Sequence, residues 1–121
     1  MDNKQLVNKF YEEVFKNGDL SNIDTFMKND YIQHSPEVKN GKAGFIEFIK
    51  LFLKLEPKIN ILNISSDNDY VYVFFKCDLN NGHTNKVCDI YRISDNKLAE
   101  HWDIIEKNIE DVKTASGNPL F

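Results

Sequence analysis

The chain has 121 residues, of which 41% are hydrophobic and 28% charged, a composition typical of one soluble globular domain over residues 1–121. Its net charge of −4, with lysine and arginine scattered along the sequence, argues against a nucleic-acid-binding surface. No apolar stretch reaches the length of a membrane span, and the first residues lack the apolar core of a secretory signal, so a cytoplasmic protein is expected.

Three helices are predicted in the first half of the chain. A capping box at Asp2 and Gln5 begins the first, and its apolar residues recur at helical spacing as far as Phe15. A short second helix is predicted around residues 21–27, and a third, after Gly41, over residues 42–55. Residues 31–34 are expected to be extended and to end before Pro36. The predicted buried face of the third helix consists of Phe45, Phe48, Ile49, Phe52 and Leu55.

The second half of the chain has the pattern of β-strands. Residues 58–65 alternate in polarity but shift phase between Ile61 and Leu62, which indicates a bulge. Further strands are predicted over 70–79 and 86–93, and residues 94–97 form a tight hairpin into 98–106. Helices followed by an antiparallel meander are typical of the α+β class. We expect a cone in which three N-terminal helices pack on a strongly curved antiparallel sheet around an internal pocket.

The segment Tyr70–Phe75 is apolar on both faces of its predicted strand. One face can pack against the helices, and the other also needs cover, which a second copy of the chain can supply. The sequence therefore predicts a homodimer formed through the outer face of the sheet.

Two acidic residues, Asp89 and Asp103, interrupt the apolar pattern of the last two strands. With a three-residue hairpin loop they face each other, and Tyr91 faces His101 on the same side of the sheet. A two- or four-residue loop would shift the register by one residue and separate the two aspartates. The candidate site therefore depends on this hairpin.

Two carboxylates in one low-dielectric pocket cannot both ionise cheaply, so the pKa of one of them should rise. Such a carboxylate can take a proton from carbon next to a carbonyl group, and a neighbouring His or Tyr can hydrogen-bond the enolate. The ligand is then a small apolar or carbonyl-containing compound. The candidate catalytic residues are Asp103, Asp89, His101 and His34, and the candidate ligand-binding residues are Tyr31, Gln33, Tyr91, Trp102, Phe48 and Phe52.

Purely structural roles for the same residues stay open. Asp103 could pair with Arg92 or Lys86 at a sheet edge, and Asp89 could be a structural partner of Arg92 or of His101. His34 could only cap a turn, and the single tryptophan could belong to the core or to an interface.

Neither a metal nor a cofactor is expected. The three histidines offer no His-x-His or His-x₃-His pair, which metal sites usually contain. Cys77 and Cys88 also lack metal-ligand spacing and are expected to be free core thiols.

Several segments resemble the SnoaL-like group of the NTF2-like superfamily. They are Tyr31-Ile32-Gln33-His34-Ser35-Pro36, Gly41 with Gly44-Phe45, Asp89-Ile90-Tyr91-Arg92, and Lys97 to Asp103, which contains Glu100-His101-Trp102-Asp103. The terminal Gly117-Asn118-Pro119-Leu120-Phe121 is also similar to the tail of one bacterial branch of that group. The resemblance covers essentially the whole chain and implies a cone-shaped α+β barrel, usually dimeric, with a pocket inside the cone.

Members of the group that this chain resembles include polyketide cyclases that perform an intramolecular aldol condensation without metal or cofactor. The resemblance places their late-strand acid at Asp103 and puts Asp89 at the assisting polar position, where relatives carry His. We therefore expect a cofactor-independent acid/base enzyme that acts on a small carbonyl compound by aldol condensation, cyclisation or isomerisation.

Two other functions stay open. An epoxide or lactone hydrolase of the same fold would need Asp89, Arg92 and Asp103 together, although Arg92 lies on the opposite face of a regular strand. A non-catalytic ligand-binding or dimerisation domain is favoured if bulky residues of the third helix, such as Phe45 and Phe48, collapse the pocket.

Overall fold

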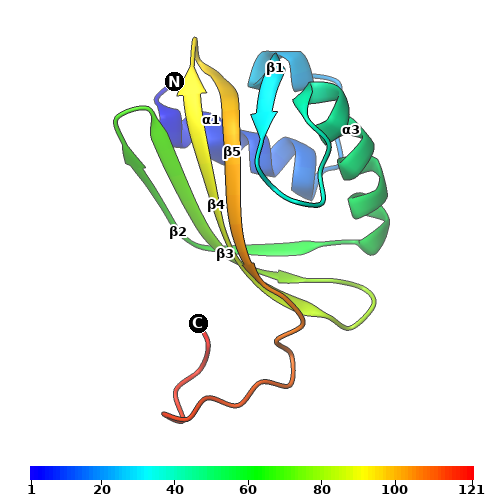
Figure 1. Ribbon diagram of the computed structural model, residues 1–121, viewed down its shortest axis with the longest axis vertical. Coiled ribbons are helices and arrows are strands. Elements are labelled where there is room, and N and C mark those ends of the chain that lie inside the picture. The colour runs from blue at the N-terminus through cyan, green and yellow to red at the C-terminus, as the bar shows by residue number, and fades with distance from the viewer.

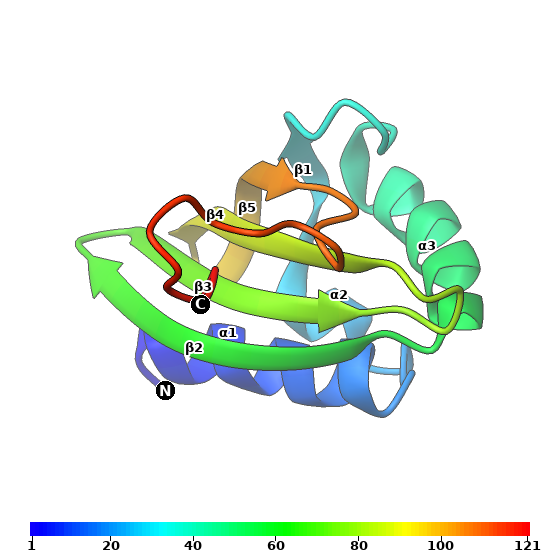
Figure 2. The same cartoon turned by 90° about the horizontal axis from the view of Figure 1, so that it is seen from below.

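A computed structural model describes residues 1–121 and contains a five-stranded sheet in the order β1-β5-β4-β3-β2. Helices lie against the concave side of the sheet, and the strands curve around them (Figure 1, Figure 2). The predicted α+β cone is confirmed. The helical segments are α1 (Asn3–Phe10), the π-helix η1 (Tyr11–Lys16), α2 (Ile23–Phe26), α3 (Gly41–Phe52) and the 3₁₀-helix η2 (Leu53–Leu55). The strands are β1 (Met27–Gln33), β2 (Lys58–Asp67), β3 (Tyr70–Asp78), β4 (Thr84–Ser94) and β5 (Lys97–Glu106).

The first helix begins at the predicted capping box. The Asp2 carboxylate accepts the Gln5 backbone N–H at 2.8 Å, and the Gln5 side chain accepts the Asp2 N–H at 2.9 Å. At Tyr11 the α-helical turn widens into η1, a π-helical segment of the kind often found at functional sites. The predicted apolar stripe is buried throughout and consists of Leu6, Val7, Phe10, Tyr11, Val14 and Phe15.

Strand β1 differs from the sequence-based expectation in length and in direction. The second helix is only four residues long, and Met27 already belongs to β1. β1 pairs with β5 in parallel, so the sheet is mixed rather than wholly antiparallel. The predicted bulge in β2 is present between Ile61 and Asn63.

Helix α3 packs tightly against the loop that follows β1. A Cβ atom at Gly44 would lie 2.0 Å from the Lys39 carbonyl oxygen, so only glycine fits at this position. This close approach holds the first turn of α3, including Phe45, against the edge of the sheet at β1.

The hairpin between β4 and β5 turns at Asp95 and Asn96, whose φ angles are both positive at 54° and 59°. Two central residues of this kind form a two-residue turn, so the three-residue loop on which the facing of the two aspartates was conditional is not formed. A two-residue turn followed by regular pairing would place Asp89 opposite Trp102 and would turn Asp103 away from it.

An extra residue in β5 restores the predicted register. Ala99 bulges between the pairs Ile93–Leu98 and Arg92–Glu100. Beyond this bulge, Asp89 pairs with Asp103 and Tyr91 pairs with His101, as expected. The bulge therefore brings the polar residues of the two strands together on the concave face.

The C-terminal segment after β5 extends away from the helices, beyond the end of the sheet (Figure 1). Its last residue, Phe121, packs on Phe74 of β3 with ring centroids 6.3 Å apart. The amines of Lys76 and Lys86 lie 5.7 Å and 5.9 Å from the Phe121 ring centroid. The end of the chain therefore docks on the outer face of the sheet rather than on the helices.

None of the helices combines the length and the apolar character that crossing a bilayer requires.

Candidate functional site

A cavity of about 470 Å³ lies between α3, η1 and the concave face of the sheet. This volume is within the usual range of small-molecule sites. The aromatic residues that form much of its wall are Phe15, Phe45, Phe48, Phe52 and Phe75. The mouth is bordered by the charged and polar residues Glu37, Lys39, Asn81, His83 and Lys107. The polar residues of the inner part are Tyr31, Gln33, Ser35, Asp89, Tyr91, His101 and Asp103.

Asp89 is buried, and both of its carboxylate oxygens are engaged by protein groups. Oδ2 accepts from the hydroxyls of Tyr11 and Tyr91, the latter at 3.3 Å, and Oδ1 lies 3.0 Å from His101 Nε2. The two tyrosine hydroxyls are 2.8 Å apart. Burial raises the pKa of both tyrosines well above 10, and the charge of Asp89 adds to this shift. Both phenols therefore stay protonated, and Asp89 is held as a structural hub of the site.

His101 is also occupied on both sides of its ring. Its Nδ1 lies 2.7 Å from Gln33 Oε1, and its Nε2 faces Asp89. The Tyr31 ring stacks on the imidazole at a centroid distance of 6.3 Å, and the Tyr91 ring lies at 4.9 Å. This packing fixes the imidazole ring in one orientation.

Asp103 is the carboxylate of the cavity that remains available to a ligand. It is half-buried, and only the Ser35 side chain stabilises its charged form by hydrogen bonding. Burial raises its pKa above 3.8, and the charges of Asp89 and Glu37 act in the same direction, while Ser35 and His101 lower it. A carboxylate that resists ionisation is a stronger base once it is ionised.

Tyr31 is a second titratable residue of the same cavity. The residue is only 1% exposed and lines the cavity. Burial raises the pKa of Tyr31 well above 10, with further contributions from the charges of Asp89 and Asp103, whereas the Gln33 side chain lowers it. The phenol therefore remains a neutral hydrogen-bond donor in the cavity that Asp103 also lines.

His34 and Trp102 lie outside the cavity, although the sequence analysis included both among the candidate site residues. Their rings stack at 4.8 Å with an angle of 5° on the outer face of the sheet. Side chains alternate along a strand, so the register that turns His101 and Asp103 inward turns Trp102 outward. This placement does not support a catalytic role for His34 or a ligand contact for Trp102.

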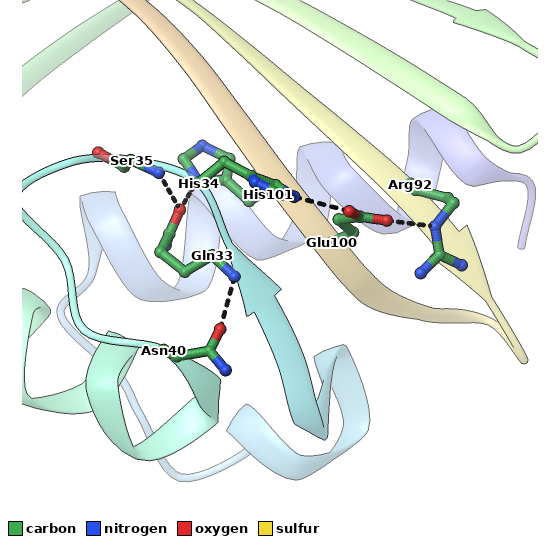
Figure 3. A network of polar contacts seen from close by, with 7 residues as sticks. All are labelled: Gln33, His34, Ser35, Asn40, Arg92, Glu100 and His101. Atoms are coloured by element: carbon green, nitrogen blue, oxygen red, sulfur yellow. Dashed lines mark hydrogen bonds and ion pairs between the residues drawn. The ribbon is translucent and has the colours of Figure 1, made fainter.

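Arg92 also lies outside the cavity. Its Nε donates to Glu100 at 2.8 Å, and the other Glu100 oxygen lies 2.7 Å from His34 Nε2 (Figure 3). The Asp89, Arg92 and Asp103 arrangement that a hydrolase would need is therefore not formed. Pairing of Asp103 with Arg92, the structural alternative, is not formed either.

The residues Asp89, His101 and Asp103 offer possible metal-ligand atoms within 4.8 Å of one another. However, a cation bound there would have to replace the hydrogen bonds that already hold His101 and Asp89. Cys77 lines the same cavity, and burial raises its pKa to about 12, so its thiol is protonated at neutral pH. Both cysteines are free; Cys77 is a core thiol, as expected, whereas Cys88 was also expected in the core and is only partly buried.

Tyr11 is a site residue that the sequence analysis counted only as part of an apolar helix stripe. The available signal was its hydroxyl group, because a buried tyrosine usually needs a hydrogen-bond partner. Here that partner is Asp89, which lies 78 residues further along the chain.

We expect Tyr11→Phe to lower the free energy of unfolding by roughly 1–3 kcal/mol, because it removes a donor from a buried carboxylate. Urea unfolding at neutral pH measures this change. Tyr72→Phe is the matched control, since Tyr72 is 38% exposed on the outer face and its change should stay within about 0.5 kcal/mol. Equal effects of the two substitutions would contradict a stabilising contact between Tyr11 and Asp89.

Solved structures with the same fold include TsrD, a proposed polyketide cyclase and an epoxide hydrolase/cyclase-like enzyme. TsrD from Streptomyces laurentii is 19% identical with a TM-score of 0.72, over 88% of this chain and 91% of TsrD. A proposed polyketide cyclase from Acidithiobacillus ferrooxidans is 20% identical with a TM-score of 0.71, over 88% and 90% of the two chains. SalBIII, described as an epoxide hydrolase/cyclase-like enzyme in pyran ring formation, is 18% identical with a TM-score of 0.72, over 85% and 89%. At these identities the likeness shows a shared fold.

At the sequence level, no protein of curated function matches this chain significantly. A profile of the SnoaL-like polyketide cyclases, in contrast, matches residues 5–108. That span includes every strand of the cone and all the polar residues of the cavity. The chain therefore belongs to the SnoaL-like polyketide cyclase family.

Proposed function

We propose that this protein is a cofactor-independent acid/base enzyme that moves a proton on a small neutral carbonyl compound. The observation that carries this proposal is that Asp103, a carboxylate of raised pKa, and Tyr31, a protonated phenol, line the same cavity. Family membership supports an enzyme of this general kind.

The proposed reaction needs one base and one neutral donor. The Asp103 carboxylate takes a proton from the carbon next to the carbonyl group, and the C–H electron pair becomes the C=C bond of an enolate. The negative charge moves to the carbonyl oxygen, which accepts a hydrogen bond from the Tyr31 hydroxyl. The enolate then attacks a second carbonyl carbon in an aldol step, and the alkoxide that forms takes the proton from Asp103. In an isomerisation, the enolate of an unsaturated ketone instead takes that proton back at another carbon.

The charges of the cavity favour an uncharged ligand. Its inner part contains two aspartates and no lysine or arginine, and the lysines of its lining, Lys39 and Lys107, lie at the mouth. These lysines form ion pairs with Glu47 and Glu37. A carboxylate or phosphate group of a ligand would therefore meet repulsion beside Asp103, whereas a ketone would not.

Hydrogen–deuterium exchange tests the proposal without knowledge of the natural substrate. The protein is incubated in D₂O with a set of small cyclic and aromatic ketones, and NMR follows the loss of the signals of protons next to the carbonyl group. We expect the protein to accelerate exchange for at least one ketone and the Asp103→Asn variant not to do so. Saturable binding of these ketones without any exchange would instead support the alternative, a non-catalytic ligand-binding domain.

We also propose that the protein forms a homodimer through the outer face of the sheet. Large hydrophobic side chains are exposed on that face, among them Ile32, Tyr70, Tyr72 and Ile104, and Ile104 is 68% exposed. A second copy of the chain would cover this apolar surface.

Light scattering after size-exclusion chromatography tests the dimer. We expect a mass of twice 14.1 kDa for the wild type and 14.1 kDa for Ile104→Asp, because a charge on the outer face opposes burial. Leu51→Asp is the control, since Leu51 is 62% exposed on α3, away from the outer face. A monomeric wild type, or equal effects of both substitutions, would contradict this interface.

A further inference from the structure

The hydrogen bonds of Gln33 determine where one proton of the site must lie. The Ser35 backbone N–H donates to Gln33 Oε1 at 3.0 Å, and a backbone N–H can only donate (Figure 3). The Gln33 atom that faces Ser35 is therefore the amide oxygen rather than the amide nitrogen. The same oxygen lies 2.7 Å from His101 Nδ1. Because an amide oxygen only accepts, His101 Nδ1 must carry a hydrogen.

Asp89 determines the state of the other ring nitrogen. His101 Nε2 lies 3.0 Å from Asp89 Oδ1, while Oδ2 accepts from the hydroxyls of Tyr11 and Tyr91. Hydrogen bonds donated to a carboxylate favour its ionised form. An ionised Asp89 accepts a hydrogen from Nε2, so the ring carries hydrogens on both nitrogens and is a cation.

The surroundings of the ring favour this positive charge. The Tyr91 ring centroid lies 4.9 Å from the imidazole, within the range of a cation–π interaction. The Asp103 carboxylate lies within 4.8 Å of the atoms that Asp89 and His101 offer. No lysine or arginine belongs to the inner part of the cavity. The titratable groups that face the ring are Asp89 and Tyr91 on β4, Asp103 on β5 and Tyr31 on β1, with Tyr11 of η1 acting through Asp89.

We propose that Gln33 is a positioning residue that holds His101 as an imidazolium, and that this cation assists Asp103 only through its charge. The role of Gln33 in catalysis rests on the proposed function, whereas the charge state of His101 does not. His101 then has no lone pair with which to act as a base and no free N–H with which to contact a ligand. Its positive charge keeps Asp103 ionised, and therefore able to accept a proton, down to a lower pH.

Nitrogen-15 NMR of the ligand-free protein tests the charge state directly. The signals of His101 are assigned by their loss in His101→Asn, which separates them from His34 and His83. At pH 7 we expect both ring nitrogens of His101 to be protonated in the wild type. A non-protonated ring nitrogen in the folded wild type would overturn the proposal, whatever the variants do.

Substitutions at Gln33 test its positioning role. Gln33→Leu removes the acceptor, so one ring nitrogen of His101 should be non-protonated at pH 7. Gln33→Glu keeps an acceptor oxygen at this position, and both nitrogens should stay protonated. His34→Gln changes the adjacent residue, which faces outward, and should leave the His101 signals unchanged. An unaltered His101 spectrum in folded Gln33→Leu would overturn the role of Gln33.

The pH dependence of the ketone exchange rate is a second test, because it would not change if Gln33 had only a structural role. Loss of the imidazolium charge raises the pKa of Asp103, so the acid limb of the profile should move to higher pH in Gln33→Leu. The rate near neutral pH should fall several-fold and recover as the pH rises. A rate that falls equally at every pH would contradict a charge effect. Absence of exchange in the wild type would count against the proposed function and not against the NMR result.

Discussion

Replacement of Asp103 by asparagine is expected to lower the rate of ketone exchange by roughly a hundredfold to ten-thousandfold, the usual contribution of a general base. The amide has nearly the same shape as the carboxylate, but it cannot accept the proton from carbon. Of the two aspartates in the inner part of the cavity, only Asp103 is free to do so, because the oxygens of Asp89 are engaged by Tyr11, Tyr91 and His101. NMR exchange rates for the two proteins, measured at several pH values, provide the comparison.

The thermal stability of the same variant distinguishes a lost base from a damaged fold. The pKa of Asp103 is raised in the folded protein, so the folded state holds this proton more tightly than the unfolded state does. At a pH above the pKa that Asp103 has in the folded protein, its ionised carboxylate therefore lowers the free energy of unfolding. This loss of stability disappears as the pH falls below about 3.9, the pKa of Asp103 in the unfolded chain. Asp103→Asn should consequently raise Tm at neutral pH but not at low pH.

Glu106→Gln is the matched control for the activity measurement, since Glu106 lies exposed on the same strand. It should change neither the exchange rate nor its pH dependence. Full activity in a folded Asp103→Asn protein would remove Asp103 as the base. A loss of activity together with a lower Tm would point to misfolding instead.

The sequence predicts the cone well because its hydrophobic periods and turn residues point to the same elements. The capping box at Asp2, the stripe to Phe15 and the bulge after Ile61 are all present. The direction of β1 could not be predicted, because a short extended segment carries no information on whether its partner strand is parallel.

The hairpin register shows where local patterns stop being sufficient. The Asp95-Asn96 turn and the Ala99 bulge each shift the pairing by one residue, and together they restore the predicted pairs. A bulge at a small apolar residue leaves no mark in the hydrophobic pattern, since both Leu98 and Ala99 are buried. Asp89 and Asp103 therefore face each other although the turn has two residues and not the three on which their pairing was conditional.

The candidate site was only partly predictable because motif residues on one strand alternate between its two faces. Within the sequence from Glu100 to Asp103, His101 lines the cavity while Glu100 and Trp102 face outward. The same division separates Gln33 from His34 at the end of β1. A motif read as a single unit cannot reveal this division.

Substitution of Tyr31 by phenylalanine is expected to lower kcat for exchange by roughly a hundredfold to a thousandfold, the usual effect of removing one donor to a developing oxyanion. The ring, which packs on His101 and Phe45, is preserved, so the cavity should keep its shape. KM should change little, because the hydrogen bond strengthens mainly as negative charge develops on the carbonyl oxygen. Saturation kinetics of the exchange reaction separate the two constants.

Tyr70→Phe serves as the control, since its hydroxyl is on the outer face and 36% of the residue is exposed. It should leave both constants unchanged. If Tyr31→Phe instead raised KM at constant kcat, the hydroxyl would contribute to ligand binding alone, and another group would have to stabilise the enolate. The other phenols near Asp89 are Tyr91, which lines the cavity, and Tyr11; both are engaged with Asp89 and with each other, so neither can replace Tyr31 without breaking those bonds. The loss of kcat should therefore persist at every pH at which Asp103 is ionised.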